Sequence, residues 1–421
     1  MDGETAAVDR LAAGLLKPLP SNFVERPWGG TRIREYKGLC PLPDQLETTG
    51  LALGEAFEIA AYDADEEARE HPSRLRFDDG SELALPALLR RHADTLLGPV
   101  FAARHGGAFP LLPKTLDVKE LLSVQGHPEG NTEAYVIIDA DPGATIRVGF
   151  NRDVDPSQLD EELTVGRARQ QRLLEWVGDR CEPARLQALL APWLASRDEE
   201  WGDLPAELRE LLEARGSDAV RLLEQLKSLY WRVLDSMNEI AVEPGMIVHN
   251  ANPARITAGT GRAPSAEVHA LGNPEAREIL MLEIRRPGPT FRAWDNVRFP
   301  LRRIDVGAAV GALNLRRVEP DELVTPASPL PGRPGAHASV ASASFELEHL
   351  RPSAGAPVAV PRSAVHSLHS LGSPVELYSE DGRPLGSMRR GESAIVSAGV
   401  GGYHVACDRA GAEVVKVSLP S

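Results

Sequence analysis

The chain has 421 residues, of which 42% are hydrophobic and 25% are charged, so it can form more than one folded domain. Its 61 acidic and 46 basic residues give a net charge of -15, which argues against nucleic acid or an anionic membrane surface as a partner. A small anionic substrate stays compatible with this charge, provided that its own pocket is basic.

Three widely separated cysteines, Cys40, Cys181 and Cys407, form neither a disulfide framework nor a cysteine-based zinc motif. Their odd number is typical of a protein in a reducing cytoplasm. The N-terminus begins with acidic residues and has only a short apolar run, so we expect no signal peptide. No stretch approaches the length of a membrane span.

Short strands broken by Gly and Pro are predicted over about 16–150, with one helix near 83–97, where apolar residues recur at helical spacing. The next stretch, 156–238, carries almost no strand pattern. It holds several helical patterns, including one at 204–212 and a clearer one that begins at Ser217, a candidate N-cap.

The β pattern resumes at Ile240, and a Pro/Ala/Ser-rich stretch at 324–344 is predicted to be a linker or a long surface loop. Short strands at the spacing of a small sandwich or barrel follow it. We therefore expect a mainly β fold with an α insertion. Its predicted parts are an N-terminal domain from 1–155 and 239–306, a helical insertion at 156–238, and a C-terminal β domain at 307–421.

The segment 110–139 carries the most chemistry. LLSVQGH alternates as a strand does, so Gln125 and His127 point to the same face. Glu133 starts the next apolar strand, and a hairpin would bring it back toward them. His249 ends a later strand behind a Pro-Gly turn. Imidazole, carboxylate and amide groups are ligands that zinc accepts, although each histidine could also be only a hydrogen-bonded strand residue.

Five blocks, in order, resemble type I mannose-6-phosphate isomerases of the cupin superfamily. They are ERPWGG, LGEAFEIA, LPKTLDVKELLSVQGHP, EPGMIVHN and LEIRRPGPTFRAWDNVR. The resemblance covers residues 25–298 and implies two cupin-type (jelly-roll) β-barrels with a helical insert. It also implies a zinc-dependent enzyme that interconverts mannose 6-phosphate and fructose 6-phosphate through a cis-enediol.

The same resemblance assigns roles to individual residues. The implied zinc ligands are Gln125, His127, Glu133 and His249, and the implied catalytic residues are Arg292, Glu283 and Lys114. Residues implied at the substrate are Trp28, Glu55, Ser123 and Asn131. Arg292 would stabilise enediolate charge, Glu283 could be the base, and Lys114 could bind phosphate or shuttle protons. Plainer roles remain open, such as turn packing for Trp28 and a surface ion pair with Asp295 for Arg292.

The chain departs from the family pattern at several points. Asn131 and Thr132 precede Glu133 where the family commonly has a basic residue, and Pro287-Gly288-Pro289 replaces its Ser-Asp. A second motif-like element, EVHALGNP, contains His269, which we expect to be structural or at the cleft rim, with a ligand role left open. These changes allow an isomerase or epimerase of another sugar, phosphorylated or not, or a non-catalytic sugar-sensing cupin.

Overall fold

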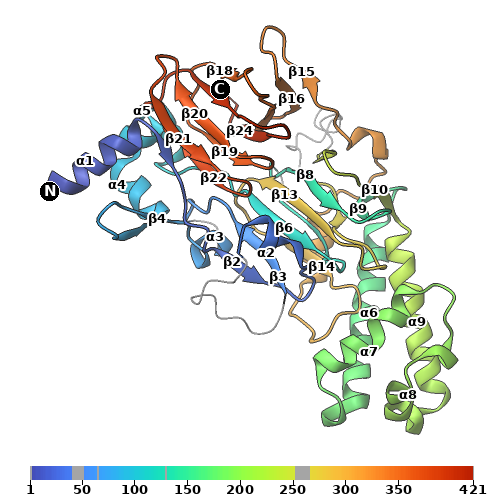
Figure 1. Cartoon of the computed structure of the whole chain (residues 1–421). Coiled ribbons are helices and arrows are strands. Elements are labelled where there is room, and N and C mark those ends of the chain that lie inside the picture. The colour runs from blue at the N-terminus through green and yellow to red at the C-terminus, as the bar shows by residue number, and fades with distance from the viewer. Residues whose placement is uncertain (1, 40–51, 64–65, 129, 252–265, 421) are drawn as a thin grey trace.

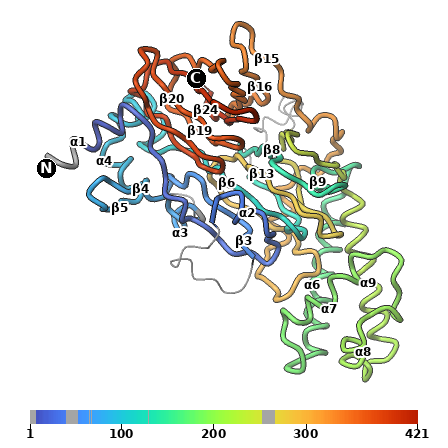
Figure 2. Tube along the Cα trace, in the orientation of Figure 1, coloured from blue at the N-terminus to red at the C-terminus, as the bar shows by residue number. Residues whose placement is uncertain are grey.

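The computed structural model describes residues 2–39, 52–63, 66–128, 130–251 and 266–420. β-Sheets form the body of the molecule, and a block of helices projects from one end of it (Figures 1 and 2). The prediction of a mainly β fold with helices inserted after the first strands is confirmed. Two cupin-type barrels stay a prediction.

Two antiparallel sheets in the N-terminal half frame the site. One has the order β11-β8-β13-β6-β3-β2 and the other β10-β9-β12-β7-β14. The strands of the first are β2 Phe23–Glu25, β3 Leu53–Phe57, β6 Lys114–Val118, β8 Glu133–Ala140, β11 Ile247–Asn250 and β13 Ile279–Arg285. Those of the second are β7 Val124–Gly126, β9 Thr145–Phe150, β10 Met237–Ala241, β12 His269–Ala270 and β14 Phe291–Trp294.

Strand β8 shows how alternation builds two cores from one strand. Tyr135 and Ile137 pack with β9 side chains between the two N-terminal sheets. Ala134 and Val136 point the other way and pack with side chains of the C-terminal half. Because both faces of β8 are buried, its sequence EAYVIIDA is almost continuously apolar after Glu133.

The C-terminal half holds a sheet of order β1-β22-β19-β24-β17-β16-β15 and a second of order β18-β23-β20-β21. Its strands are β15 Ser328–Pro329, β16 Ala336–Ala341, β17 Glu346–Leu350, β18 Val358–Val360, β19 His366–Ser370, β20 Val375–Ser379, β21 Pro384–Met388, β22 Ser393–Val396, β23 Tyr403–Ala406 and β24 Val414–Ser418. The N-terminal β1, Leu15–Leu16, joins this half by pairing with β22. The predicted domain 1–155 therefore contributes to both halves.

The predicted linker 324–344 is partly strand. β16 pairs with β17, and its Ala336 and Val340 are buried while the residues between them are half-buried. The composition of β16, rich in small residues, is typical of a flexible loop, but these small side chains fit against the neighbouring strand β17 near the edge of the sheet. This is a case in which tertiary pairing outweighs local composition.

The inserted helices are α6 Pro156–Val177, α7 Pro183–Ala195, α8 Ala206–Leu212 and α9 Ser217–Leu234. In α9, one apolar face is buried at Leu223, Leu226, Tyr230, Val233 and Leu234, whereas Val220 is half-buried. Gly216, not Ser217, occupies the N-cap, and Met237 already belongs to β10. The block packs on the outer face of the five-stranded sheet through one continuous apolar cluster.

The remaining helices lie mostly in the N-terminal part. They are α1 Asp2–Ala12, α2 Arg32–Tyr36, α3 Glu66–Glu70, α4 Leu85–Leu97, α5 Pro99–His105 and α10 Val306–Ala312, and a small hairpin joins β4 Arg74–Arg76 to β5 Glu82–Ala84. The helix predicted near 83–97 is thus present as α4. Within the described part of the chain, no helix combines the length and apolar character needed to cross a bilayer.

Candidate metal centre and its pocket

Strand pairing in the five-stranded sheet brings two polar side chains together. β12 lies beside β7, and His269 stands directly opposite Gln125 in the register. The side-chain Nε2 atoms of these two residues are 3.1 Å apart. His127 follows just after β7, so the end of this strand and β12 together present one amide and two imidazoles.

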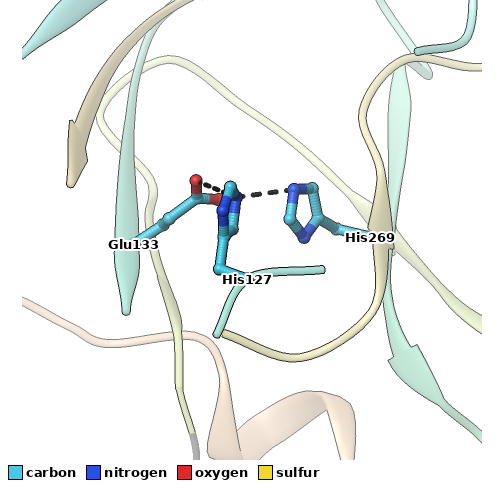
Figure 3. A group of neighbouring side chains, drawn as sticks. All are labelled: His127, Glu133 and His269. Atoms are coloured by element: carbon cyan, nitrogen blue, oxygen red, sulfur yellow. Dashed lines mark ion pairs between the residues drawn. The ribbon is translucent and has the colours of Figure 1, made fainter. Parts of the chain in front are cut away.

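Glu133 completes the group from the other sheet. Its Oε1 lies 2.7 Å from His127 Nε2, and its Oε2 lies 3.5 Å from His269 Nε2. Figure 3 shows the carboxylate and both imidazoles converging, and each of the three offers a ligand atom within 4.8 Å of the other two. The three side chains are buried. β7 and β8 lie in different sheets, so they do not form the hairpin expected from sequence.

The outer nitrogen of each imidazole faces a backbone carbonyl. His127 Nδ1 is 3.1 Å from Pro289 O, and His269 Nδ1 is 2.9 Å from Glu267 O. A carbonyl only accepts, so each Nδ1 donates a hydrogen, and in the neutral ring Nε2 is then the nitrogen whose lone pair is available to a metal. This is the arrangement that metal-binding histidines adopt.

The electrostatics favour a charged carboxylate at Glu133. Burial alone raises the pKa of Glu133, but His127 and His269 outweigh it and hold this pKa well below its usual range. Burial lowers the pKa of His269, although Glu133 partly opposes the effect. The donor set of two imidazole nitrogens, one carboxylate and the Gln125 amide fits a four-coordinate zinc ion.

His249, the histidine favoured by the sequence, lies elsewhere. In the pairing of β11 with β8, His249 stands opposite Ala134, and Asn250 stands opposite Glu133. His249 therefore points to the C-terminal half, where its ring centroid is 6.1 Å from that of Phe345. Burial lowers its pKa to about 4. The structure thus groups His269, and not His249, with His127 and Glu133.

Gln125, His127 and Glu133 lie in the wall of a cavity of about 330 Å³, and His269 lies behind them, outside the described lining. Among its described lining residues are four glutamates and six cationic side chains, so the cavity is locally basic in an acidic protein. The cations are Arg26, Lys114, Arg285, Arg292, Arg298 and Arg302, and the carboxylates are Glu25, Glu55, Glu133 and Glu283. Such a lining suits a small anionic ligand.

Glu283 and Lys114 face each other inside this cavity. They are directly paired in the register of β13 and β6. Burial, followed by the nearby Glu133 carboxylate, raises the pKa of Glu283 to about 7, although Lys114 and Arg285 oppose the rise. Lys114 Nζ lies 4.6 Å from the centroid of the Phe57 ring. A carboxyl group with such a pKa can exchange protons near neutral pH.

The other predicted side chains are mostly at the same cavity. Trp28, Glu55, Ser123 and Arg292 all line it. Glu55 is paired with Arg26 at 2.8 Å, and Ser123 Oγ donates to Gln125 Oε1 at 2.8 Å.

Arg292 belongs to β14 and is paired with Gln125 in the register. Its strand position therefore puts it next to the metal centre. Asp295, the predicted surface partner of Arg292, accepts from Arg302 Nε at 2.9 Å.

Asn131 is the exception among the predicted substrate residues, since it is absent from the described lining of the cavity. It is buried, and its side-chain atoms have no hydrogen-bond partner among the described residues. A Cβ on Gly288 would lie 3.0 Å from Asn131 Nδ2. Two departures from the family pattern, at 131 and at 287–289, therefore lie against each other.

Three residues at or beside the metal centre, His269, Asn250 and Arg285, were not assigned a site role from the sequence. His269 had a visible signal in EVHALGNP. Asn250 Nδ2 lies 3.1 Å from His269 Nδ1 and donates to the Tyr135 hydroxyl at 2.9 Å, and that hydroxyl donates to Glu133. Arg285 had a weaker signal, a charge directly after the buried run ILMLEI.

Part of the chain matches a known protein family. Residues 68–144 match the phosphomannose isomerase type I catalytic domain. This stretch contains Lys114, Gln125, His127 and Glu133, so part of the metal centre falls within the match. Glu283 and Arg292 lie outside it.

Curated relatives carry the same name. The chain is 30% identical over 155 residues to mannose-6-phosphate isomerase ManA of Bacillus subtilis, which is 34% of this chain and 42% of that protein. It is 32% identical over 145 residues to mannose-6-phosphate isomerase of Streptococcus mutans, covering 31% and 39%. The matches thus span about two fifths of each relative.

Solved phosphomannose isomerases share the fold along nearly the whole chain. The Bacillus subtilis mannose 6-phosphate isomerase superimposes with a TM-score of 0.60 at 18% identity, over 96% of this chain and 99% of that one. A mannose 6-phosphate isomerase bound with zinc and yttrium gives 0.58 at 15% identity, over 97% and 100%. At these identities the likeness concerns the fold.

Proposed function

We propose that this protein is a zinc-dependent aldose–ketose isomerase that interconverts mannose 6-phosphate and fructose 6-phosphate. The observation that carries the proposal is the convergence of His127, Glu133 and His269 on one centre at the wall of a basic cavity. The family match over 68–144 and the names of the relatives support the same reaction.

The proposed metal ligands are His127, Glu133, His269 and the Gln125 amide. The Gln125 nitrogen now faces His269, and turning the amide over would present its oxygen instead, which is the ligand that zinc requires. Zinc held there would act as a Lewis acid that orients the sugar oxygens and favours negative charge on them.

The proton transfers fall to the side chains of the cavity. Conversion of the aldose into the ketose moves one proton from C2 to C1 and another from O2 to O1, with no net gain or loss. Glu283 is the proposed base, since its raised pKa of about 7 lets it take and return a carbon-bound proton near neutral pH. Lys114, paired with it in the register, would favour its ionised form.

Charge on the enediolate needs a fixed positive group. Arg292 lines the cavity on the strand beside Gln125, and its guanidinium is the proposed partner of that charge. The other cationic side chains of the lining give the cavity a net positive charge, which favours a phosphorylated sugar over a neutral one.

A second candidate is an isomerase of a different sugar. It is favoured by Asn131, which leaves a neutral side chain before Glu133 and lies outside the described lining of the cavity. The test is to incubate the zinc-loaded protein with mannose 6-phosphate, other aldose 6-phosphates and the free aldoses, and to measure ketose formation. Turnover of mannose 6-phosphate above all others is expected. Turnover of only a free aldose would select the second candidate, and no turnover with any substrate would leave a sugar-binding protein.

A further inference from the structure

Arg285 lines the cavity, and the proposed reaction assigns it neither a proton transfer nor a place among the metal ligands. It ends β13, only 2% of its surface is exposed, and it lines the cavity beside Glu283. In the register of β13 on β8 it stands directly opposite Glu133. Burying a guanidinium is costly unless its hydrogens are satisfied, so its fixed partners indicate what it does.

The first partners of Arg285 belong to the turn that follows β13. Its Nη1 donates to Arg286 O and to Gly288 O, each at 3.1 Å. The next carbonyl along this turn, that of Pro289, accepts from Nδ1 of His127 at 3.1 Å. The guanidinium therefore holds the turn that sets the ring orientation of a proposed metal ligand.

The second partner of Arg285 is the proposed base. Its Nε lies 3.4 Å from Glu283 Oε1, and the pair is almost completely buried. A planar guanidinium can bond two carbonyls and a carboxylate from one rigid group, which an ammonium on a flexible stem cannot do. Arg285 thus connects the metal side of the cavity to the proton-transfer side.

We propose that Arg285 is a positioning residue. Through the Pro287–Pro289 turn it fixes the orientation of the His127 ring relative to the Glu283 carboxyl group. The inference rests on the proposed function for its kinetic part but not for its metal-binding part. It predicts that loss of the guanidinium weakens zinc binding and slows turnover, while the binding of the sugar changes little.

The experiment compares Arg285→Gln and Arg285→Lys with a matched control, Arg147→Gln. Arg147 is also a buried arginine that donates to a backbone carbonyl, Leu234 O at 3.2 Å, and pairs with a glutamate, Glu239 at 3.2 Å. It lies on the face of the five-stranded sheet that carries the inserted helices. Zinc affinity is measured by competition with a chromogenic chelator, and Tm and steady-state kinetics are measured on the same preparations.

We expect both Arg285 variants to bind zinc about tenfold more weakly or worse and to lose kcat with KM nearly unchanged. Arg147→Gln should lower Tm without changing zinc affinity. If Arg285→Gln does not fold, the zinc affinity of Arg285→Lys is the test, because lysine keeps the positive charge and lacks only the planar guanidinium. Unchanged zinc affinity in the folded Arg285 variants, or an equal loss in Arg147→Gln, overturns the proposal. Weaker zinc binding in a protein that isomerises no sugar phosphate would refute the proposed function and leave this role intact.

Discussion

His269 lies opposite Gln125 across β12 and β7, with the two side-chain nitrogens 3.1 Å apart. This pairing makes His269 the fourth proposed ligand. We predict about one zinc per chain in the purified protein and in His249→Ala, and little zinc in His269→Ala and His127→Ala. Elemental analysis of the four proteins measures this. Retained zinc in His269→Ala with loss in His249→Ala would reverse the assignment.

Removal of zinc should stop turnover without unfolding the protein. The apolar clusters between the sheets and under the inserted helices do not depend on the metal centre. After chelation, the protein should still unfold in one cooperative thermal transition, followed by circular dichroism. Its Tm should be lower, because a ligand of the native state contributes to its stability. Restoration of activity on adding zinc is the control. Cooperative unfolding by the chelator alone would make the centre structural.

Arg292 should affect kcat far more than KM. If its guanidinium meets charge that develops only in the transition state, Arg292→Ala lowers kcat by on the order of 100-fold or more. Arg292→Lys should restore little of this, since it lacks the planar fork. Arg302→Gln removes an arginine from the rim of the same cavity and should act mainly on KM. Unchanged kcat in both Arg292 variants would exclude the catalytic role.

The pH profile of kcat/KM should report Glu283. A base must be ionised in the free enzyme, and burial raises the pKa of this carboxyl to about 7. Activity should therefore fall about tenfold per pH unit below neutrality and level off above it. Glu283→Gln should lose most activity at every pH while still binding zinc. An acid limb that persists unchanged in the residual activity of Glu283→Gln would assign the titration to another group.

Asp117, which has no role in the proposed chemistry, should make stability depend on pH. Its buried carboxylate accepts from Ile33 N at 2.7 Å, and burial raises its pKa to about 7. In the unfolded chain the group ionises near pH 4, so the unfolded state binds fewer protons between about pH 4 and 7 and stability falls as pH rises there. Asp117→Asn lacks this titration. Between pH 5 and pH 8, its free energy of unfolding, measured with denaturant, should therefore rise relative to that of the wild type by on the order of 2 kcal/mol. Parallel pH profiles for the two proteins would contradict this.

Local patterns in the chain pointed to residue types that zinc accepts, and the family resemblance implied which of them would form the site. Alternation along LLSVQGH puts Gln125 and His127 on one face, because the side-chain period of a strand is two residues. Glu133 stands out because it is a charged residue at the start of a strand that is otherwise mostly apolar. The helical insertion was predictable as well, because a stretch with only a 3.6-residue period cannot continue a sheet.

Which histidine joins the cluster was decided only by the tertiary structure. His249 lies near the end of β11 and His269 begins β12, and nothing local shows which of these strands will lie beside β7. The register of β11 puts Asn250, not His249, opposite Glu133, and a shift of one residue turns a side chain to the other face of the sheet. Arg285 acquires its partners in the same way, from a neighbouring strand and a turn. The sequence by itself therefore determined the chemistry of the ligands, and long-range strand pairing decided which of the candidate side chains meet, because register is a property of two strands and not of one.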